Sequence, residues 1–108
     1  MKEIKKTMTK QMTARRDDTP LHTAVREGKT DLLLEMIGEH DGVELKELLA
    51  EQNQSGETAL YVAAEYGYTD MVKILMKHSD SVLAGTKAKN GFDAFHIAAK
   101  NGNLRELT

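Results

Sequence analysis

The sequence contains no cysteine and no tryptophan, and it has a single proline among its 108 residues. Without cysteine, the chain has neither a disulfide framework nor a thiolate metal site. It also lacks a long apolar run and the apolar core of a secretory signal. We therefore expect it neither to enter the secretory route nor to span a membrane by itself. This length predicts one domain with a modest core.

Motifs for catalysis and ligand binding are equally scarce. The sequence has no His-Glu-x-x-His run, no glycine loop followed by lysine and serine or threonine, and no EF-hand loop. His40 and His78 stand without metal-ligand neighbours, and the adjacent Asp17 and Asp18 suit helix capping better than paired acid–base work. Nothing indicates a nucleophile–base pair. We predict a protein that is not an enzyme and needs no cofactor or metal.

The net charge of −2 is unevenly distributed. Residues 1–16 carry six basic side chains and one glutamate, a net charge of +5, so the remainder carries −7. Ile4, Met8 and Met12 recur every four residues, which is helical spacing. One interpretation is a solvated tail that packs loosely on the domain that follows. The other is a basic arm for anionic lipid or an acidic partner. Nucleic acid is not expected, because no aromatic residue interleaves with the charges.

What the sequence does contain is one block in three copies. The copies end at Gly28, Gly67 and Gly102, so their spacings are 39 and 35 residues. A recurrence in this range is typical of a repeat array. The copies read Asp17-Asp18-Thr19-Pro20-Leu21-His22-Thr23-Ala24-Val25-Arg26-Glu27-Gly28, then Gly56-Glu57-Thr58-Ala59-Leu60-Tyr61-Val62-Ala63-Ala64-Glu65-Tyr66-Gly67, then Gly91-Phe92-Asp93-Ala94-Phe95-His96-Ile97-Ala98-Ala99-Lys100-Asn101-Gly102.

Each copy predicts a short helix with defined ends. Thr19, Thr58 and Asp93 have side-chain oxygens that cap a helix N-terminus, and Pro20 suits a first helical turn. Alanines follow in each copy and allow neighbouring helices to approach closely. The closing glycines then allow the chain to turn through positive φ.

A second apolar helix is predicted after the first two copies, over residues 31–37 and 70–76. The first is apolar on nearly every side, which predicts a helix sandwiched between layers. Residues 39–52 form an acidic insertion, for which there are two alternatives. One is an extra short helix whose apolar face holds Val43, Leu45, Leu48 and Leu49. The other alternative is a longer loop with solvated carboxylates. Residues 80–84 predict one helical turn.

Thr19-Pro20-Leu21-His22-Thr23-Ala24 matches the signature of the ankyrin repeat, and the chain resembles that family. The second copy has alanine and tyrosine where the signature has proline and histidine, and the third keeps only His96 and the alanine after Ile97. The resemblance implies an all-α ankyrin solenoid of helix-turn-helix units, with two full repeats and a truncated third. The chain then divides into five segments, which are a basic N-terminal arm (1–13), repeat 1 (14–38), the insertion (39–52), repeat 2 with its connection (53–87) and a partial repeat 3 (88–108).

The basic lead-in over residues 6–19, the acidic connection and residues 53–60 resemble the start of plant ankyrin proteins that end in a Pro-Gly-Gly-containing transmembrane domain. This resemblance implies the N-terminal fragment of a stress or defence signalling protein. Full-length members are membrane-anchored with cytosolic repeats, so this chain is expected to be cytoplasmic. The sequence predicts a last helix that begins at Leu104 and stops at Thr108, without the polar cap that ends a solenoid. The alternatives are a truncated fragment with no activity of its own and a membrane-surface binder acting through the basic arm.

Ankyrin repeats imply a protein partner on the concave face of first helices and turn tips. Tyr66 and Phe92 are the expected anchors, because aromatic residues dominate interface energetics. Alternatively, Phe92 tucks against the next loop and Tyr66 covers the first repeat. The resemblance also implies that His22 and His96 hydrogen-bond the backbone of an adjacent loop. The oligomeric state stays open. Beside Asp18, the family's variable positions correspond to Arg15, Arg16, Arg26, Glu27, Gln54, Ser55, Glu57, Glu65, Tyr66, Lys89, Asn90, Phe92, Lys100 and Asn101.

Overall fold

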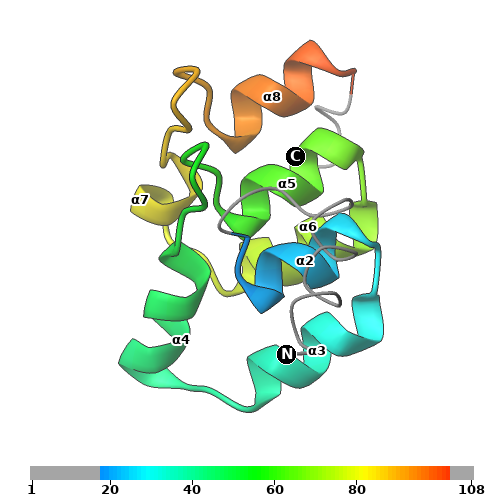
Figure 1. Ribbon diagram of the computed structural model, residues 1–108, viewed down its shortest axis with the longest axis vertical. Helices are drawn as coiled ribbons and strands as arrows, with labels where there is room; N and C mark the ends of the chain where they lie inside the picture. Colours follow the sequence, from blue (N-terminus) through cyan, green and yellow to red (C-terminus); the bar gives the residue numbers. More distant parts are fainter. Residues whose placement is uncertain (1–17, 103–108) are drawn as a thin grey trace, which may run out of the picture.

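The computed structural model describes residues 18–102, and within that range every regular element is a helix. The predicted all-α fold is confirmed for this part of the chain. In order along the sequence (Figure 1), the helices are α2 (Pro20–Arg26), α3 (Thr30–Gly38), α4 (Gly42–Ala50), α5 (Ala59–Tyr66), α6 (Thr69–Lys77), α7 (Ser81–Ala84) and α8 (Ala94–Lys100).

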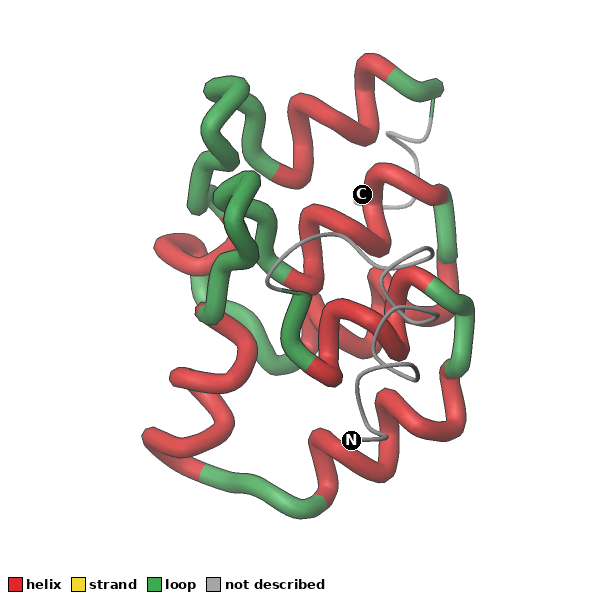
Figure 2. The backbone as a smooth tube through the Cα atoms, in the orientation of Figure 1, coloured by secondary structure: helices red, strands yellow, loops and turns green. Residues whose placement is uncertain are grey.

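The helices form two stacked layers. Helix α5 packs between α2 and α8 in the first layer, and α3 and α6 pack against α2 and α5, respectively, in the second (Figure 1). The loops that lead into α5 and α8 stand side by side at one edge of the stack (Figure 2). There the backbone N–H of Lys89 donates to the carbonyl oxygen of Ser55 at 2.9 Å. Repeats 2 and 3 therefore contact each other through both a helix and a loop.

The predicted caps are present at all three first helices. Side-chain oxygens of Thr19, Thr58 and Asp93 accept hydrogen bonds from the backbone N–H three residues later. At α2, the side chain of His22 accepts a hydrogen bond from the backbone N–H of Thr19, which completes a capping box. The glycines that close the three blocks have φ values of 74°, 72° and 78°. The repeated block thus specifies where each first helix begins and where the chain turns after it.

The core is centred on α5. All six residues Ala59–Ala64 are buried, and three of them are alanines that let α2 and α8 approach closely from either side. Burial at the stack's end differs. In α3 only Leu33 and Ile37 are buried, whereas Leu32 and Leu34 are 39% and 49% exposed. Among the described residues no element lies on the outer side of this helix, so the predicted sandwich is not seen in this part of the chain.

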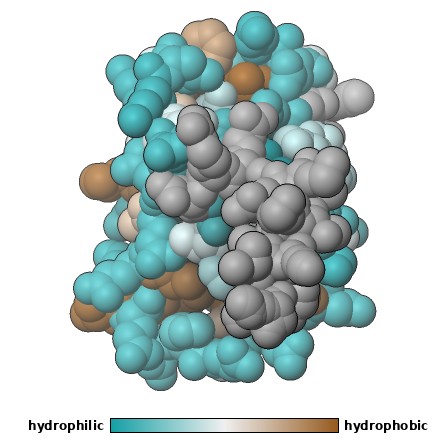
Figure 3. Space-filling model, viewed as in Figure 1, coloured by the Kyte–Doolittle hydropathy of each residue, from teal (hydrophilic) through white to brown (hydrophobic). Residues whose placement is uncertain are grey.

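The two connections between repeats each contain an additional helix. Helix α4 occupies the acidic insertion, which agrees with the extra-helix alternative, and α7 is the predicted single turn, capped by the side chain of Asp80. Lys46 and Asp80 link the two helices by an ion pair of 3.4 Å. Only Leu49 of α4 is buried, and Val43 is 70% exposed, so Val43 does not belong to the buried face as predicted. Brown hydrophobic surface appears over α4 and α7 in Figure 3.

Some predictions fall outside the described residues. They are the structure of the basic N-terminal arm, the placement of Arg15 and Arg16, and the helix expected to begin at Leu104.

Candidate interaction surface

A hollow of about 460 Å³ lies between the loop tips and first helices of the second and third repeats. Two features of the fold create it. The loop containing Ser55 and the loop containing Lys89 form one wall, and α5 and α8 form the other. Eight of the fourteen residues predicted to bind a partner line it, and they are Gln54, Ser55, Glu57, Glu65, Lys89, Asn90, Phe92 and Lys100. Tyr61 and Ile97 complete the lining.

The hollow combines charges of both signs with an aromatic ring. Lys89 and Lys100 are exposed, and Glu65 of α5 is half-buried. Phe92 is also half-buried, because it packs against the core on one side and stacks on the His96 ring at 6.2 Å between centroids. Its packing agrees with the alternative in which Phe92 tucks into the fold, yet part of the ring still faces the hollow. Such a lining suits a polar protein surface with one apolar side chain.

A hydrogen bond links Asn90 and Tyr61, two residues that line the hollow. Nδ2 of Asn90 donates to the hydroxyl of Tyr61 at 2.9 Å, and Oδ1 of Asn90 accepts from the backbone N–H of Phe92. The amide of Asn90 is therefore committed to the loop that carries Phe92. Tyr61 was not among the predicted residues. It occupies the position that the ankyrin signature gives to histidine, and this correspondence was the available signal.

Arg26 and Glu57, both predicted as partner-binding residues, are instead buried in a polar network between the first two repeats. The guanidinium of Arg26 donates to both carboxylate oxygens of Asp18, at 2.9 and 3.2 Å, and to Oε1 of Glu57 at 3.3 Å. Nδ2 of Asn53 donates to the same two carboxylates at 2.9 Å each. Side chains of Arg26, Asp18 and Glu57 are 8%, 1% and 8% exposed. A partner therefore meets little of Arg26 or Glu57.

Two carboxylates surround one guanidinium in this network, and the electrostatics favour the charged arginine. Burial, the largest single effect, would lower the pKa of Arg26. Hydrogen bonds and charge interactions with Asp18 and Tyr66 outweigh it and raise that pKa above its usual value. Arg26 is thus a permanent cation that compensates buried negative charge.

Sequence reasoning missed Asn53, which organises this network. Its Oδ1 accepts hydrogen bonds from the backbone N–H groups of Ser55 and Glu57 at 3.0 and 2.9 Å. This is the Asx-type turn that asparagine forms ahead of a glycine. The signal was present in Asn53-Gln54-Ser55-Gly56, a turn-forming run directly before the capped helix α5.

Tyr66, the preferred aromatic anchor, lies next to the hollow and does not line it. The residue is 43% exposed. Its ring packs at a tilt against the ring of Tyr68, with centroids 5.5 Å apart, and lies under the guanidinium of Arg26, 5.9 Å from the ring centroid. Tyr66 therefore covers the first repeat, as its alternative reading expected, and still presents an open side. Nearby, Nδ2 of Asn101 donates to the carbonyl oxygen of Glu65 at 3.0 Å.

Comparison with known proteins decides the family. A family model described as ankyrin repeats in three copies matches residues 2–83 and again 42–107. The chain belongs to the ankyrin-repeat family. Ankyrin repeats are protein-interaction modules and are generally not catalytic. The predicted fold and family are therefore confirmed.

Several of the curated relatives that match are plant ankyrin proteins. An ankyrin repeat-containing protein of Arabidopsis thaliana is 98% identical over 107 residues, which is 99% of this chain and 20% of the relative. The ankyrin repeat-containing protein ITN1 of the same plant is 36% identical, covering 92% of this chain and 20% of its own length. A third Arabidopsis ankyrin protein is 32% identical over 76% of this chain and 17% of its own. The chain spans about a fifth of the length of these relatives.

Three histidines of this ankyrin chain make hydrogen bonds of two kinds, either between repeats or within one repeat. The ring of His22 bonds the carbonyl oxygen of Glu57 in the next loop at 2.7 Å, as the resemblance implied. His96 occupies the equivalent position in the third repeat, but its Nδ1 bonds its own cap residue Asp93 at 2.7 Å, and the side chain is 62% exposed. His40 bonds the carbonyl oxygen of Met36 at 2.9 Å. These are structural roles within or between repeats.

Among residues 18–102, no group of three or more histidine, cysteine, aspartate or glutamate side chains is arranged to hold a metal ion. In the same range no helix has the length and apolar character needed to cross a bilayer. Glu27, the remaining predicted binding residue, is exposed and pairs with Lys29 at 3.1 Å.

Proposed function

We propose that this chain binds a protein partner through its concave ankyrin face, centred on the hollow between the second and third repeats. One observation carries the proposal. Eight positions selected from the sequence as variable surface positions converge on one hollow, although they come from two different repeats. Glu57 among them is buried, so the exposed contacts come from the other seven.

The chemistry of the hollow defines the partner surface that fits. The exposed Lys89 and Lys100 would favour acidic side chains on the partner, and Glu65 adds a negative charge to the lining. Complementary charges would fix the orientation of the partner and increase its rate of association. The open side of Phe92 offers an apolar contact at the centre, where binding energy is usually concentrated.

The wider role is also a proposal. We place these repeats in stress or defence signalling on the cytosolic side of a membrane-associated plant protein, with this chain itself cytoplasmic. Two facts support that reading. The lead-in and acidic connection resemble the plant proteins with a transmembrane domain, and two of the curated relatives that match are Arabidopsis ankyrin proteins about five times as long.

Charge reversal in the hollow tests the partner site. The double variant Lys89→Glu, Lys100→Glu changes two exposed side chains of the hollow. Its matched control is Lys73→Glu, Lys77→Glu on α6, which makes the same change in charge on exposed residues outside the hollow. Immobilised wild-type and variant chains would be used to capture proteins from Arabidopsis seedling extract, and the captured proteins would be compared by mass spectrometry.

We expect the control to retain the proteins captured by wild type and the hollow variant to lose them, with all three chains showing the same melting temperature. Equal capture by both variants would reject the hollow as the binding site. Loss with both variants would indicate that capture depends on overall charge and would reject the assignment as well.

A further inference from the structure

The outer face of α3 is apolar at the positions where a preceding layer would lie. Helices α3 and α6 both begin with Thr-Asp and correspond residue by residue, so Leu32 matches Met71 and Met36 matches Leu75. Met71 and Leu75 are each 1% exposed, whereas Leu32 is 39% exposed and Met36 is half-buried. Helix α6 has α3 before it in the stack, and no described element precedes α3. These two positions therefore face the preceding layer.

Helix α2 is adapted to an end position and α3 is not. Pro20 is exposed and Thr23 is half-buried, while their counterparts in α5, Ala59 and Val62, are fully buried. The threonine places a hydroxyl where the inner repeat has an apolar valine. No such exchange occurs in α3, which keeps leucine and methionine on the same side of the stack. The apolar pair on α3 is thus the part of this end that gains from being covered.

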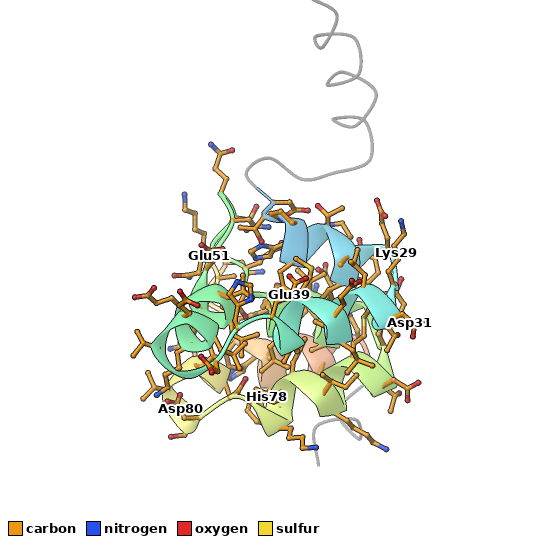
Figure 4. The ribbon with its side chains drawn as sticks, turned by 90° about the horizontal axis from the view of Figure 1, so that it is seen from below. Lys29, Asp31, Glu39, Glu51, His78 and Asp80 are labelled. Carbon is orange, nitrogen blue, oxygen red and sulfur yellow. The ribbon has the colours of Figure 1, made fainter. Side chains whose placement is uncertain are left out.

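Carboxylates surround this pair. Asp31, Glu35 and Glu39 are all exposed and come from α3 or its C-terminal cap (Figure 4 labels the first and last). Lys29, the N-cap residue of α3, pairs with Glu27 at 3.1 Å. A segment that covers Leu32 and Met36 would therefore be favoured by positive charge next to apolar side chains.

The chain's own residues 1–16 have both properties. They carry a net charge of +5, and Ile4, Met8 and Met12 are spaced to fall on one side of a helix. The segment joins the domain just before Pro20, and α2 packs directly on α3. Packed helices lie about 8–10 Å apart, and sixteen helical residues span about 24 Å, so the segment reaches α3 easily.

We propose that the outer face of α3, formed by Leu32, Met36, Asp31, Glu35 and Glu39, is a binding site for residues 1–16 of the same chain. The apolar side chains of the segment cover Leu32 and Met36, and its lysines meet the three carboxylates. The segment then takes the place that a preceding repeat would occupy against α3.

A nitroxide label on the segment tests this in the full chain. Because the chain has no cysteine, Thr9→Cys creates a single labelling site, and residue 9 lies away from the Ile4, Met8 and Met12 spacing. Amide signals of residues 31–39 would be recorded by NMR with the label oxidised and then reduced. We expect these signals to lose most of their intensity in the oxidised sample, well beyond the signals of α8. The loss should shrink at about 1 M NaCl, where the Debye length is about 3 Å.

Two variants make the result specific. Leu32→Ser, Met36→Ser removes the apolar pair and should abolish the intensity loss at residues 31–39. Val43→Ser, Val82→Ser alters exposed apolar residues on α4 and α7 and should leave it unchanged. The proposal is overturned if the intensity loss at residues 31–39 is the same in both double variants as in the unmodified chain, or if the loss is centred on α4.

Two further outcomes name other occupants. Mixing isotope-labelled chain without nitroxide and unlabelled chain with nitroxide detects contacts between molecules. Intensity loss that appears in this mixture as strongly as in the single sample means that a second copy occupies the face. Signals of residues 31–39 that are unaffected in solution, with the label immobilised only by vesicles containing phosphatidylserine, mean that the segment binds lipid. Either result overturns the proposal.

Discussion

His22 joins the first two repeats by donating a hydrogen bond from Nε2 to the carbonyl oxygen of Glu57 at 2.7 Å. The backbone N–H of Thr19 donates to the other ring nitrogen, Nδ1, at 3.2 Å. Nδ1 is therefore an acceptor, and the proton of the neutral ring must be on Nε2. One imidazole thus caps α2 and anchors the next loop at the same time.

Replacing His22 should destabilise the chain far more than replacing its counterpart. His22→Ala leaves the carbonyl of Glu57 and the N–H of Thr19 without these partners in a buried setting. We expect a loss of about 3 kcal/mol in the free energy of unfolding. His96→Ala, at the same repeat position but exposed, should cost about 0.5 kcal/mol. Urea denaturation followed by circular dichroism measures both, and equal losses would contradict the role assigned to His22.

Removing Arg26 should be among the most damaging single changes. Arg26→Ala leaves the buried carboxylates of Asp18 and Glu57 without their cation, at a cost of about 3–5 kcal/mol. Arg26→Lys keeps the charge but loses the paired bonds to Asp18, so it should recover only part of the stability. Thermal unfolding of both variants is the measurement.

The matched control for Arg26 is Glu27→Ala, which breaks only the exposed pair with Lys29. Its cost should be within about 1 kcal/mol. A fold that tolerates Arg26→Ala as well as Glu27→Ala would show that the network contributes little.

Gly56 should be less replaceable than Gly91, although both have positive φ, of 80° and 88°. A Cβ on Gly56 would lie 2.8 Å from the backbone N of Lys89, whereas one on Gly91 would meet nothing within 4 Å. Gly91→Ala should cost about 1–2 kcal/mol from backbone strain alone. Gly56→Ala should cost clearly more, because it also separates the two loops. Denaturant midpoints of the two variants give the difference, and similar values would argue against close loop contact in solution.

The cap of α8 should give the chain a specific acid sensitivity. Burial, the largest single effect, would raise the pKa of Asp93, but hydrogen bonds from the backbone N–H and the ring of His96 lower it below 3.8. A carboxyl with a depressed pKa stabilises the fold above its unfolded value and loses this effect as the pH falls through the folded value.

Asp93→Asn keeps a good capping side chain but removes the charge. Its melting temperature should be below that of wild type at neutral pH, and the gap should close as the pH is lowered beneath 3.8. Asp70→Asn, an exposed residue of α6 that caps no helix, provides the comparison. A gap for Asp93→Asn that is independent of pH would exclude the proposed charge effect.

The sequence allowed the helices and their ends to be predicted because these depend on neighbours along the chain. Thr19, Thr58 and Asp93 cap the helix that follows them directly, so a motif of a few residues determines the outcome. Helix α4 was only one of two alternatives, because its apolar spacing did not reveal whether another part of the chain would pack against it. Val43 shows the limit, because the spacing placed it on a buried face and no partner covers it.

Burial across repeats was less predictable. Arg26 and Glu57 are 31 residues apart, and only the stacking of the first two repeats brings them together with Asp18. Family positions suggested that both face a partner, whereas their charges compensate each other inside the protein. The apolar composition of α3 likewise predicted burial on all sides, whereas Leu32 and Leu34 are exposed in the described part of the chain. Composition does not record where in a stack a helix stands.

The hydrogen bonds between loops and helices give the array a direction. His22 reaches forward to the loop of repeat 2, and Tyr61 receives a bond from the loop of repeat 3. Within the described residues, the exposed His96 has no later loop to reach. A repeat grafted after α8 would need to bring a backbone carbonyl, whereas one grafted before α2 would need to bring the side chain that reaches forward. The two ends of the stack are therefore not interchangeable as sites for building a longer binding protein.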